Sequence, residues 1–532
     1  DYFLGGRDAT WLAIGASIFA SNIGSEHLIG LAGAGASSGM AMAHWEIQGW
    51  MILILGWVFV PFYTRSMVYT MPEFLERRYN PQSRTILSVI SLVSYVLTKV
   101  AVTVYAGGLV FQQVFGIKEL WGIDFFWIAA IGLVVLTALY TIFGGMKSVL
   151  YTSVLQTPIL LLGSLIILVL GFKELGGWDE MMRVCGAVTV NDYGDTMTNL
   201  IRSNDDANFP WLGALIGSAI IGFWYWCTDQ FIVQRVLSGK NEMEARRGTI
   251  FGAYLKLLPV FLFLIPGMIA FALHQKYIGA GGEGFLPMLA NGTANADAAF
   301  PTLVAKLLPA GVKGLVVCGI LAALMSSLAS LFNSSAMLFT IDFYKRFKPE
   351  TPEKKLVGIG QIATIVIVVL GILWIPIMRS VGDVLYTYLQ DVQSVLAPGI
   401  AAAFLLGICW KRTSAQGGMW GLISGMVIGL TRLGAKVYYS NAGEVADSTF
   451  KYLFYDMNWL FFCGWMFLFC IIVVIVVSLA TEAPTAEKIQ GLVFGTATKE
   501  QKAATRASWN HWDIIHTVII LAITAAFYWY FW

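Results

Sequence analysis

The sequence predicts an all-α polytopic membrane protein with about thirteen transmembrane helices. Hydrophobic residues make up 57% of the chain and charged residues only 12%, with a mean hydropathy of +0.70. Soluble domains carry about 25% charged residues, so this composition excludes that class. The chain also contains repeated apolar segments of roughly 20 residues, the length that crosses a bilayer. The first of these segments is interrupted by polar residues, which indicates more than a passive membrane anchor.

The apolar segments follow one another with short polar connections. Taken in order along the chain, the predicted spans cover residues 9–32, 43–64, 86–113, 123–143, 149–172, 209–236, 249–275, 308–341, 357–379, 381–409, 416–436, 457–480 and 512–532.

Lys and Arg are distributed unevenly between alternate loops. By the positive-inside rule, the loops that are rich in Lys and Arg face the cytoplasm. The basic set consists of Arg65, Arg77, Arg78, Arg84, Lys147, Arg235, Lys240, Arg246, Arg247, Lys345, Arg346, Lys348, Lys354, Lys355, Lys411, Arg412 and the stretch 488–506. We therefore expect a multi-pass protein of the cytoplasmic (inner) cell membrane whose chain starts inside and whose C-terminus lies outside.

The first span contains the polar stretch Ala-Ser-Asn-Ile-Gly-Ser-Glu-His at residues 20–27. An unsatisfied polar group in hydrocarbon costs several kcal/mol, so spanning helices avoid such stretches unless they line a cavity. Glu26 and His27 beside the break favour a binding site, because ionisable residues at membrane depth are usually functional. A glycine-kinked structural helix is the alternative.

A second break is expected five spans later, near Gly222. Five is an odd number, so two five-span halves would cross the membrane in opposite directions. This is the inverted-repeat plan of secondary transporters, in which solute and ion sites lie where two broken helices meet. Glycine is common in spanning helices, so the spacing alone leaves a repeat and a simple kink equally open.

Other spans carry polar groups that cannot lie unpaired in lipid. Glu46 lies in the second span, Lys256 in the seventh, and Gln390 and Asp391 in the tenth. Together with the aromatic run 223–226, they suit a sugar, whose CH faces stack on rings while its hydroxyls bind charged and amide groups. A structural Glu46–Lys256 ion pair is the alternative for the individual residues.

The eighth span places Ala323, Ser326 and Ser327 on one helix face. With the backbone carbonyls of Ala20 and Ile23, the two hydroxyls would form a neutral oxygen shell for a monovalent cation, whereas Ca²⁺ sites usually include carboxylates. Small residues on a helix face also serve plain helix packing, which is the more common explanation on spacing alone.

Two classes of function find no support in the residues. No nucleophile–base pair or metal-ligand spacing stands out, so we do not expect an enzyme. The formal net charge is +2 and no basic run is long enough to indicate a nucleic-acid partner.

Several stretches resemble the solute:sodium symporter family, and most closely its sodium/glucose cotransporters. They are Ala-Ser-Asn-Ile-Gly-Ser-Glu-His (20–27), Gly-Gly-Met-Lys-Ser-Val-Leu-Tyr-Thr (144–152), Trp-Tyr-Trp-Cys-Thr-Asp-Gln (224–230), Met-Ser-Ser-Leu-Ala-Ser-Leu-Phe-Asn-Ser (325–334) and Tyr-Leu-Gln (388–390). The resemblance implies a five-plus-five inverted-repeat (LeuT-type) core with additional C-terminal helices. Its units would be residues 1–172 (core helices 1–5), 209–409 (core helices 6–10) and 416–532 (additional helices).

The resemblance also implies roles for individual residues. The implied sugar contacts are Asn22, His27, Glu46, Tyr225, Trp226, Lys256 and Gln390. The implied gates are Leu31, Trp45 and Tyr386 on the outer side and Tyr225 on the inner side. The implied sodium ligands are Ala20, Ile23, Ala323, Ser326 and Ser327.

The function implied is sodium-coupled symport of a hexose such as glucose or galactose by alternating access. Family members with a second sodium site have Asp where this chain has Ser153 and a hydroxyl where it has Ala329, so we expect one sodium per sugar. Symport of another polyol such as myo-inositol is the alternative, as is a sugar-gated sensor, although the sensor-like relative carries Glu in place of Gln390. The expected partners are the sugar, Na⁺ and the bilayer, and a homo-oligomer stays open.

Overall fold

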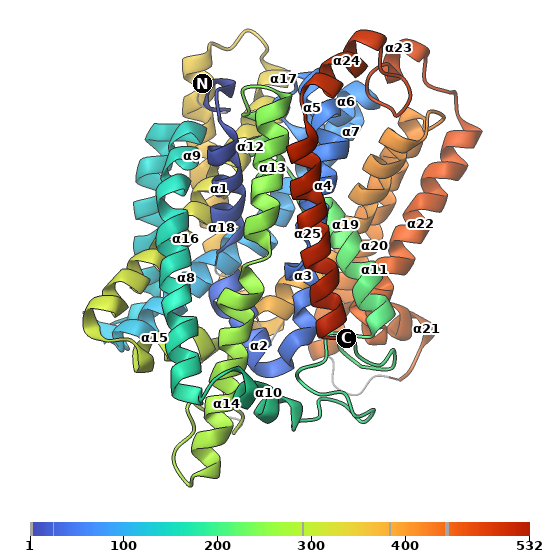
Figure 1. The fold of residues 1–532 in the computed structure, drawn as a ribbon. Coiled ribbons are helices and arrows are strands. Elements are labelled where there is room, and N and C mark those ends of the chain that lie inside the picture. Colours follow the sequence, from blue (N-terminus) through green and yellow to red (C-terminus); the bar gives the residue numbers. More distant parts are fainter. Residues whose placement is uncertain (1–3, 25, 290–291, 382–384, 442–445) are drawn as a thin grey trace.

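Helices that run roughly along one direction build the structure, a computed structural model (Figure 1). It describes residues 4–24, 26–289, 292–381, 385–441 and 446–532. At positions 5, 97, 113, 140, 142–148, 155–156, 377–381, 385–388 and 441, the backbone alone is described. Within this part of the chain, ten helical segments are long and apolar enough to cross a membrane, and Trp11–Asn22 and Phe125–Leu139 are shorter apolar helices. The predicted all-α membrane architecture is confirmed, with thirteen as an approximate count.

The N-terminal third of the chain holds the first broken helix and the helices that follow it. Its elements are η1 (Gly5–Arg7), α1 (Trp11–Asn22), η2 (Glu26–Leu31), α2 (Ala32–Ser38), η3 (Gly39–Met42), α3 (Ala43–Glu46), α4 (Gly49–Ile54), η4 (Leu55–Phe59), α5 (Val60–Ser66), α6 (Met71–Arg78), α7 (Pro81–Ser94), η5 (Tyr95–Val100), α8 (Ala101–Phe115), α9 (Phe125–Leu175) and α10 (Trp178–Gly186). A small antiparallel pair, β1 (Glu119–Leu120) and β2 (Ile123–Asp124), places Glu119 opposite Asp124 before α9.

The middle of the chain holds the second broken helix. Its elements are α11 (Trp211–Gly222), η6 (Phe223–Thr228), α12 (Gln230–Leu237), α13 (Glu242–Lys256), η7 (Val260–Leu264), α14 (Ile265–Gly279), η8 (Ala296–Ala298), α15 (Ala299–Leu307), α16 (Ala310–Met337), η9 (Leu338–Tyr344), α17 (Lys345–Phe347), α18 (Glu353–Val381) and α19 (Leu385–Cys409).

The remaining helices cover one side of this bundle and end at the C-terminus. They are α20 (Ala415–Asn441), α21 (Thr449–Lys451), η10 (Tyr452–Asp456), α22 (Trp459–Ala480), α23 (Ala486–Ile489), α24 (Lys499–Ala507) and α25 (His511–Tyr530).

Helix starts follow the usual capping chemistry. Asn80 caps α7 by accepting a 2.8 Å hydrogen bond from the Ser83 amide, and Pro81 occupies the first helical position, where its missing N–H is not needed. Asp124 likewise accepts from the Phe126 amide at 3.0 Å where α9 begins. These caps fix the residues at which the two helices begin.

The two broken helices run in opposite directions. Figure 1 shows α1 starting at the end of the molecule where the N-terminus lies and α2 continuing toward the other end, whereas α11 starts at that other end and α12 finishes near the first. The chain leaves helical geometry at Ile23, whose backbone is extended, and again at Asp229. Gly222 itself stays helical, so the second break lies farther along than its sequence suggested.

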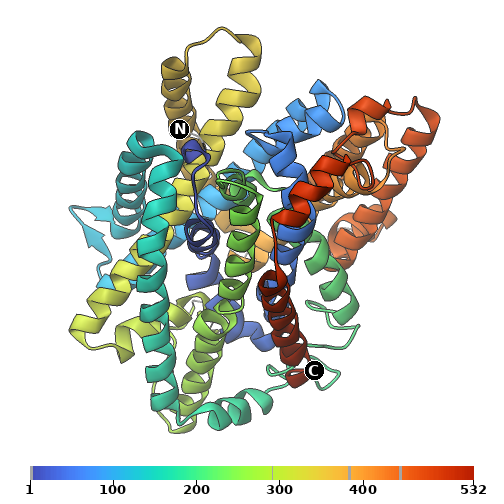
Figure 2. The ribbon, with the colours of Figure 1, turned by 45° about the horizontal axis from the view of Figure 1, so that its top comes forward.

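The broken helix α1 lies inside the bundle, where α9, α13 and α16 surround it (Figure 2). Its contact with α13 depends on small residues, because a Cβ atom at Gly248 would lie 2.6 Å from the Ile14 side chain. Glycine is the residue that lets two helix backbones approach so closely in a membrane.

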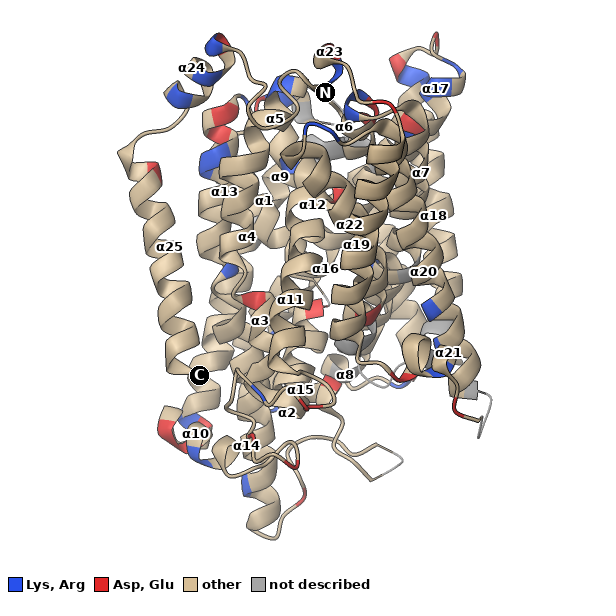
Figure 3. Cartoon of the chain, turned by 90° about the vertical axis from the view of Figure 1, so that its right-hand side faces the viewer, with Lys and Arg blue, Asp and Glu red and all other residues tan. Residues whose placement is uncertain are grey.

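Positive charge gathers at one end of the molecule. Figure 3 shows Lys and Arg concentrated around α5, α6, α17 and α24, with fewer around α10 and α14 at the opposite end. The two chain termini also lie at opposite ends (Figure 1).

Candidate functional site

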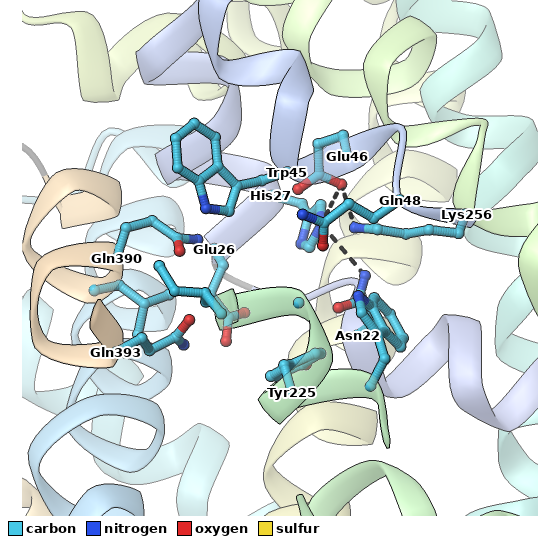
Figure 4. A pocket seen from close by; sticks show the side chains of 14 residues that line it. Asn22, Glu26, His27, Trp45, Glu46, Gln48, Tyr225, Lys256, Gln390 and Gln393 are labelled. Atoms are coloured by element: carbon cyan, nitrogen blue, oxygen red, sulfur yellow. Dashed lines mark hydrogen bonds and ion pairs between the residues drawn. The ribbon is translucent and has the colours of Figure 1, made fainter. Parts of the chain in front are cut away.

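A pocket lies where the two breaks face each other (Figure 4). Side chains from α1, η2, α3, η6, α13 and α19 contribute to its wall. The lining residues are Asn22, Glu26, His27, Trp45, Glu46, Gln48, Ile221, Gly222, Tyr225, Trp226, Lys256, Leu389, Gln390 and Gln393. All seven residues predicted as sugar contacts are among them. The fold thus brings together residues as far apart in the sequence as Asn22 and Gln390. That the seven residues bind a substrate stays a prediction.

Glu46 is the centre of a charged cluster in the pocket wall. Its Oε2 atom lies 2.5 Å from Lys256 Nζ and 3.0 Å from His27 Nε2. Asn22 Nδ2 in turn lies 3.4 Å from His27 Nε2. All four side chains are buried, so the break in α1, the short helix α3 and the end of α13 are joined by charge-assisted hydrogen bonds.

Four buried polar atoms of the pocket have no hydrogen-bond partner among the described residues. They are Glu26 Oε2, His27 Nδ1, Trp45 Nε1 and Gln390 Oε1. Buried polar atoms are nearly always paired, and each exception calls for an explanation. Trp45 Nε1 can only donate, whereas the Glu26 carboxylate and Gln390 Oε1 accept. A ligand that both donates and accepts hydrogen bonds would satisfy the set.

Aromatic side chains close the pocket at its two ends. Trp45 stacks on Trp459 of α22, with ring centroids 5.4 Å apart, and meets Phe209 edge-on at 6.1 Å. At the other end, Tyr225 packs edge-on against Trp226 at 4.9 Å. Of the other predicted gates, Leu31 is fully buried in η2 and outside the lining, and the Tyr386 side chain lies outside the described residues.

The free space in the pocket is small. Its volume of about 50 Å³ offers room for a few water molecules, whereas ligand pockets usually measure roughly 300–1,000 Å³. Side chains that line the pocket would have to move before a solute larger than a few waters could fit.

One predicted ion ligand, Ser327, contacts the end of α1 beside the break. Ser327 Oγ of α16 donates to the Ser21 carbonyl at 3.0 Å, and the last carbonyls of a helix lack partners within that helix. Ser326 Oγ lies 3.3 Å from Ser153 Oγ of α9, and Ala323 is buried on the same stretch of α16. The Ser327 hydroxyl thus adjoins the helix end that carries the Ala20 and Ile23 carbonyls. Binding of sodium by the predicted ligands stays a prediction.

A buried ion pair below Tyr225 escaped the sequence analysis. Lys99 of η5 donates to Asp229, and Tyr95 OH donates to the same carboxylate at 2.6 Å. Lys99 Nζ also lies 4.8 Å from the Tyr225 ring centre and 4.2 Å from that of Phe231. Asp229 caps α12 by accepting from the Phe231 amide at 3.2 Å. The second break is therefore fixed by a lysine from a helix distant in sequence.

Three polar lining residues were missed as site residues. Gln393 follows Gln390 by three positions on α19, so helical spacing could have identified it. Gln48 donates to the Ser218 carbonyl at 2.8 Å, a contact with no signal in the sequence. Glu26 was noted beside the break but not assigned to the pocket. By contrast, Asp391 pairs with Lys436 of α20 and lies outside the lining.

Comparison of the sequence with known proteins identifies the family to which the chain belongs. The family model described as "Sodium:solute symporter family" matches residues 2–425. The chain belongs to the sodium:solute symporter family. It is 37% identical over 508 residues to the human (Homo sapiens) protein named sodium/myo-inositol cotransporter 2, covering 93% of this chain and 74% of that protein.

Other relatives point to the same family. The sheep (Ovis aries) protein named sodium/glucose cotransporter 1 is 38% identical over 499 residues, covering 90% of this chain and 74% of that protein. The fold matches the substrate-bound outward-open structure of a Na⁺-coupled sialic acid symporter with a TM-score of 0.72 at 23% identity, covering 91% and 92% of the two chains.

Membership of the family establishes the general activity. The protein is a sodium:solute symporter that crosses the membrane several times, with sodium as the coupling ion and a small molecule as the solute. It is a transporter and not an enzyme, and its core has the predicted LeuT-type fold.

Proposed function

We propose that the protein is a sodium-coupled symporter of a hexose such as glucose or galactose, working by alternating access. The observation that carries this proposal is the set of three buried atoms around one pocket, His27 Nδ1, Trp45 Nε1 and Gln390 Oε1, that have no hydrogen-bond partner among the described residues. A hydroxyl group both donates and accepts hydrogen bonds, so a polyhydroxylated ring can satisfy Trp45 Nε1 and Gln390 Oε1 together.

The remaining pocket residues support the same solute class. Glu46 and Lys256 offer charged partners to hydroxyls, and Asn22 offers an amide. Tyr225 and Trp226 offer ring faces on which the CH groups of a sugar pack. In this proposal Trp45, Leu31 and Tyr386 close the outer path and Tyr225 closes the inner one.

Sodium is proposed to bind at the Ala20 and Ile23 carbonyls with Ala323, Ser326 and Ser327. Bound there, it holds the broken helix in the form that presents Asn22 and His27, so the ion favours the outward-open, solute-binding state. One sodium per solute is supported by Ser153, which is buried and donates to the Val149 carbonyl at 2.7 Å. Position 153 therefore offers a second sodium ion a hydroxyl and not a carboxylate.

The arrangement in the membrane is part of the proposal. The basic end of the molecule faces the cytoplasm, so the C-terminus lies outside and the protein resides in the cytoplasmic membrane. The functional units are residues 1–172 and 209–409, which form the two inverted repeats, and 416–532, which add peripheral helices.

A second candidate solute is myo-inositol. It is favoured by the 37% identity to proteins named sodium/myo-inositol cotransporters, and inositol presents hydroxyls around a ring as hexoses do. Both solutes offer the hydroxyl donors and acceptors that the buried polar atoms of the pocket need.

Uptake by purified protein in proteoliposomes tests the proposal. Labelled glucose, galactose and myo-inositol are offered singly, with sodium or with choline outside. We expect sodium-dependent uptake of a hexose that is inhibited by excess unlabelled hexose. Uptake of inositol alone would establish the second candidate, and sodium-dependent uptake of none of the three would refute the proposed substrate class.

A further inference from the structure

Glu26 is a pocket carboxylate to which the proposed function gives no role. It starts η2 directly after the break in α1, and Figure 4 shows it away from the cluster of Glu46, His27 and Lys256. Its Oε2 atom is fully buried and has no hydrogen-bond partner among the described residues. A buried carboxylate without a partner is costly, so it should have a counterpart when the protein works.

The Glu26 carboxylate reaches from the pocket toward the predicted ion site. A Cβ atom built on Gly24 would lie 2.6 Å from Glu26 Oε2 and 2.6 Å from Ser327 Oγ. Both oxygens therefore crowd the same side of Gly24. This position needs glycine because any side chain there would collide with the two oxygens.

The charges around the ion site create a need for a nearby anion. Arg235 of α12 is buried and donates to Ser21 Oγ at 3.1 Å, so a positive charge lies beside the end of α1. The predicted sodium ligands are all neutral. A sodium ion at Ser327 would be repelled by Arg235 unless a negative charge offsets it.

Other carboxylates nearby are already committed. Glu46 is bound to Lys256 and His27, and Asp229 is bound to Lys99 and Tyr95.

We propose that Glu26 is the anionic group that stabilises sodium beside Ser327 and couples the ion to the substrate pocket. The inference rests on the sodium site of the proposed function and adds a residue to it. Because Glu26 lines the pocket and adjoins the ion ligands, sodium binding would fix its side chain and hence the shape of the pocket. By linkage, substrate would then tighten sodium binding by the same factor.

Sodium binding to the purified protein without substrate tests this directly. We compare wild type with Glu26→Gln, which keeps the shape and removes the charge, and with Glu26→Asp, which keeps the charge on a shorter side chain. Glu180→Gln on α10 is the matched control, because Glu180 lies in an exposed pair with Arg183. Binding of ²²Na⁺ is titrated, and substrate affinity is measured separately at saturating sodium.

We expect Glu26→Gln to weaken sodium binding about tenfold or more, which corresponds to about 1.4 kcal/mol. The sodium affinity of Glu26→Asp should lie between that of Glu26→Gln and that of wild type. The sodium affinity of Glu180→Gln should match that of wild type. Substrate affinity at saturating sodium should change by less than about threefold, because the ion restores the site once bound.

Two results would overturn the inference. One is unchanged sodium affinity in Glu26→Gln while Ser327→Ala, measured in parallel, loses affinity. That result would leave the proposed ion site intact and remove Glu26 from it. The other is a loss of substrate affinity at saturating sodium with normal sodium binding, which would make Glu26 a substrate contact only. Because ²²Na⁺ binding needs no substrate, it also stays informative if the proposed hexose is wrong.

Discussion

Lys256 Nζ lies 2.5 Å from Glu46 Oε2 inside the wall of the pocket. The sequence left two explanations for these residues, a structural ion pair and a solute site. The geometry combines them, because the pair is buried and at the same time lines the cavity. Substitutions at Lys256 should therefore change both the stability of the protein and its transport.

Lys256→Ala should abolish uptake and also destabilise the protein. Breaking a buried ion pair by removing one partner costs about 3–5 kcal/mol, because the other charge stays buried and uncompensated. Thermal unfolding of the detergent-solubilised variant measures the loss. An unchanged unfolding temperature together with wild-type uptake would contradict both roles.

The double variant Glu46→Gln/Lys256→Met separates the two roles. Replacing both charges by neutral groups of similar size is often neutral for stability, so the unfolding temperature should recover. Uptake should stay absent, because the charged partners for the solute hydroxyls are gone. If uptake recovered along with stability, the pair would be structural only.

Gln390→Glu should strongly weaken sugar uptake and leave the fold intact. Its Oε1 atom is buried in the pocket without a partner among the described residues, so the new charge would have no counterpart there. The loss of a hydrogen bond to a buried group is worth about 1–3 kcal/mol in binding. Uptake kinetics provide the readout, and Gln416→Glu at the exposed start of α20 is the control. Wild-type affinity in Gln390→Glu would remove this residue from the site.

Ser327→Ala and Ser326→Ala should each lower the apparent sodium affinity by about tenfold, the effect of losing one hydrogen-bonding partner of a charged group. Solute binding at saturating sodium should change much less. The sodium dependence of uptake is titrated for each variant, with Ser424→Ala on α20 as a control outside the site. Unchanged sodium dependence in the double variant would leave the two serines as packing residues.

One sodium ion should accompany each solute molecule. A second buried cation would need its desolvation offset by ligands, and Ser153 in place of a carboxylate removes the strongest electrostatic contribution. Reversal potentials measured at several sodium and solute concentrations give the ratio. The double variant Ser153→Asp/Ala329→Thr should raise the number of sodium ions per solute. A ratio of two sodium ions per solute in wild type would contradict the argument from positions 153 and 329.

Much of the fold and the candidate site could be predicted because polar residues in apolar segments have few explanations. The break at residues 20–27 and the inward-facing Glu46, Lys256 and Gln390 follow from the cost of unsatisfied polar groups in lipid. The serine face of α16 was visible as helical spacing, although packing alone would have explained it equally well.

The second break could not be placed correctly, and the reason is tertiary. Gly222 stays helical, and its missing side chain instead makes room for Gln48. The break occurs at Asp229, whose carboxylate caps α12 and binds Lys99 of η5. Lys99 and Asp229 lie 130 residues apart, so neither the pair nor its contact with Tyr225 leaves a local pattern in the sequence.

Accumulation of solute against its gradient tests the central claim most directly. Proteoliposomes with an interior-negative potential of about 100 mV receive labelled hexose and sodium at equal concentrations inside and outside. One charge crossing 100 mV is worth about 2.3 kcal/mol, which supports accumulation of roughly 50-fold. We predict sodium-dependent accumulation toward that limit, which collapses when the potential is dissipated. Equilibration of hexose at a ratio of about one, with sodium and potential present, would contradict coupled symport.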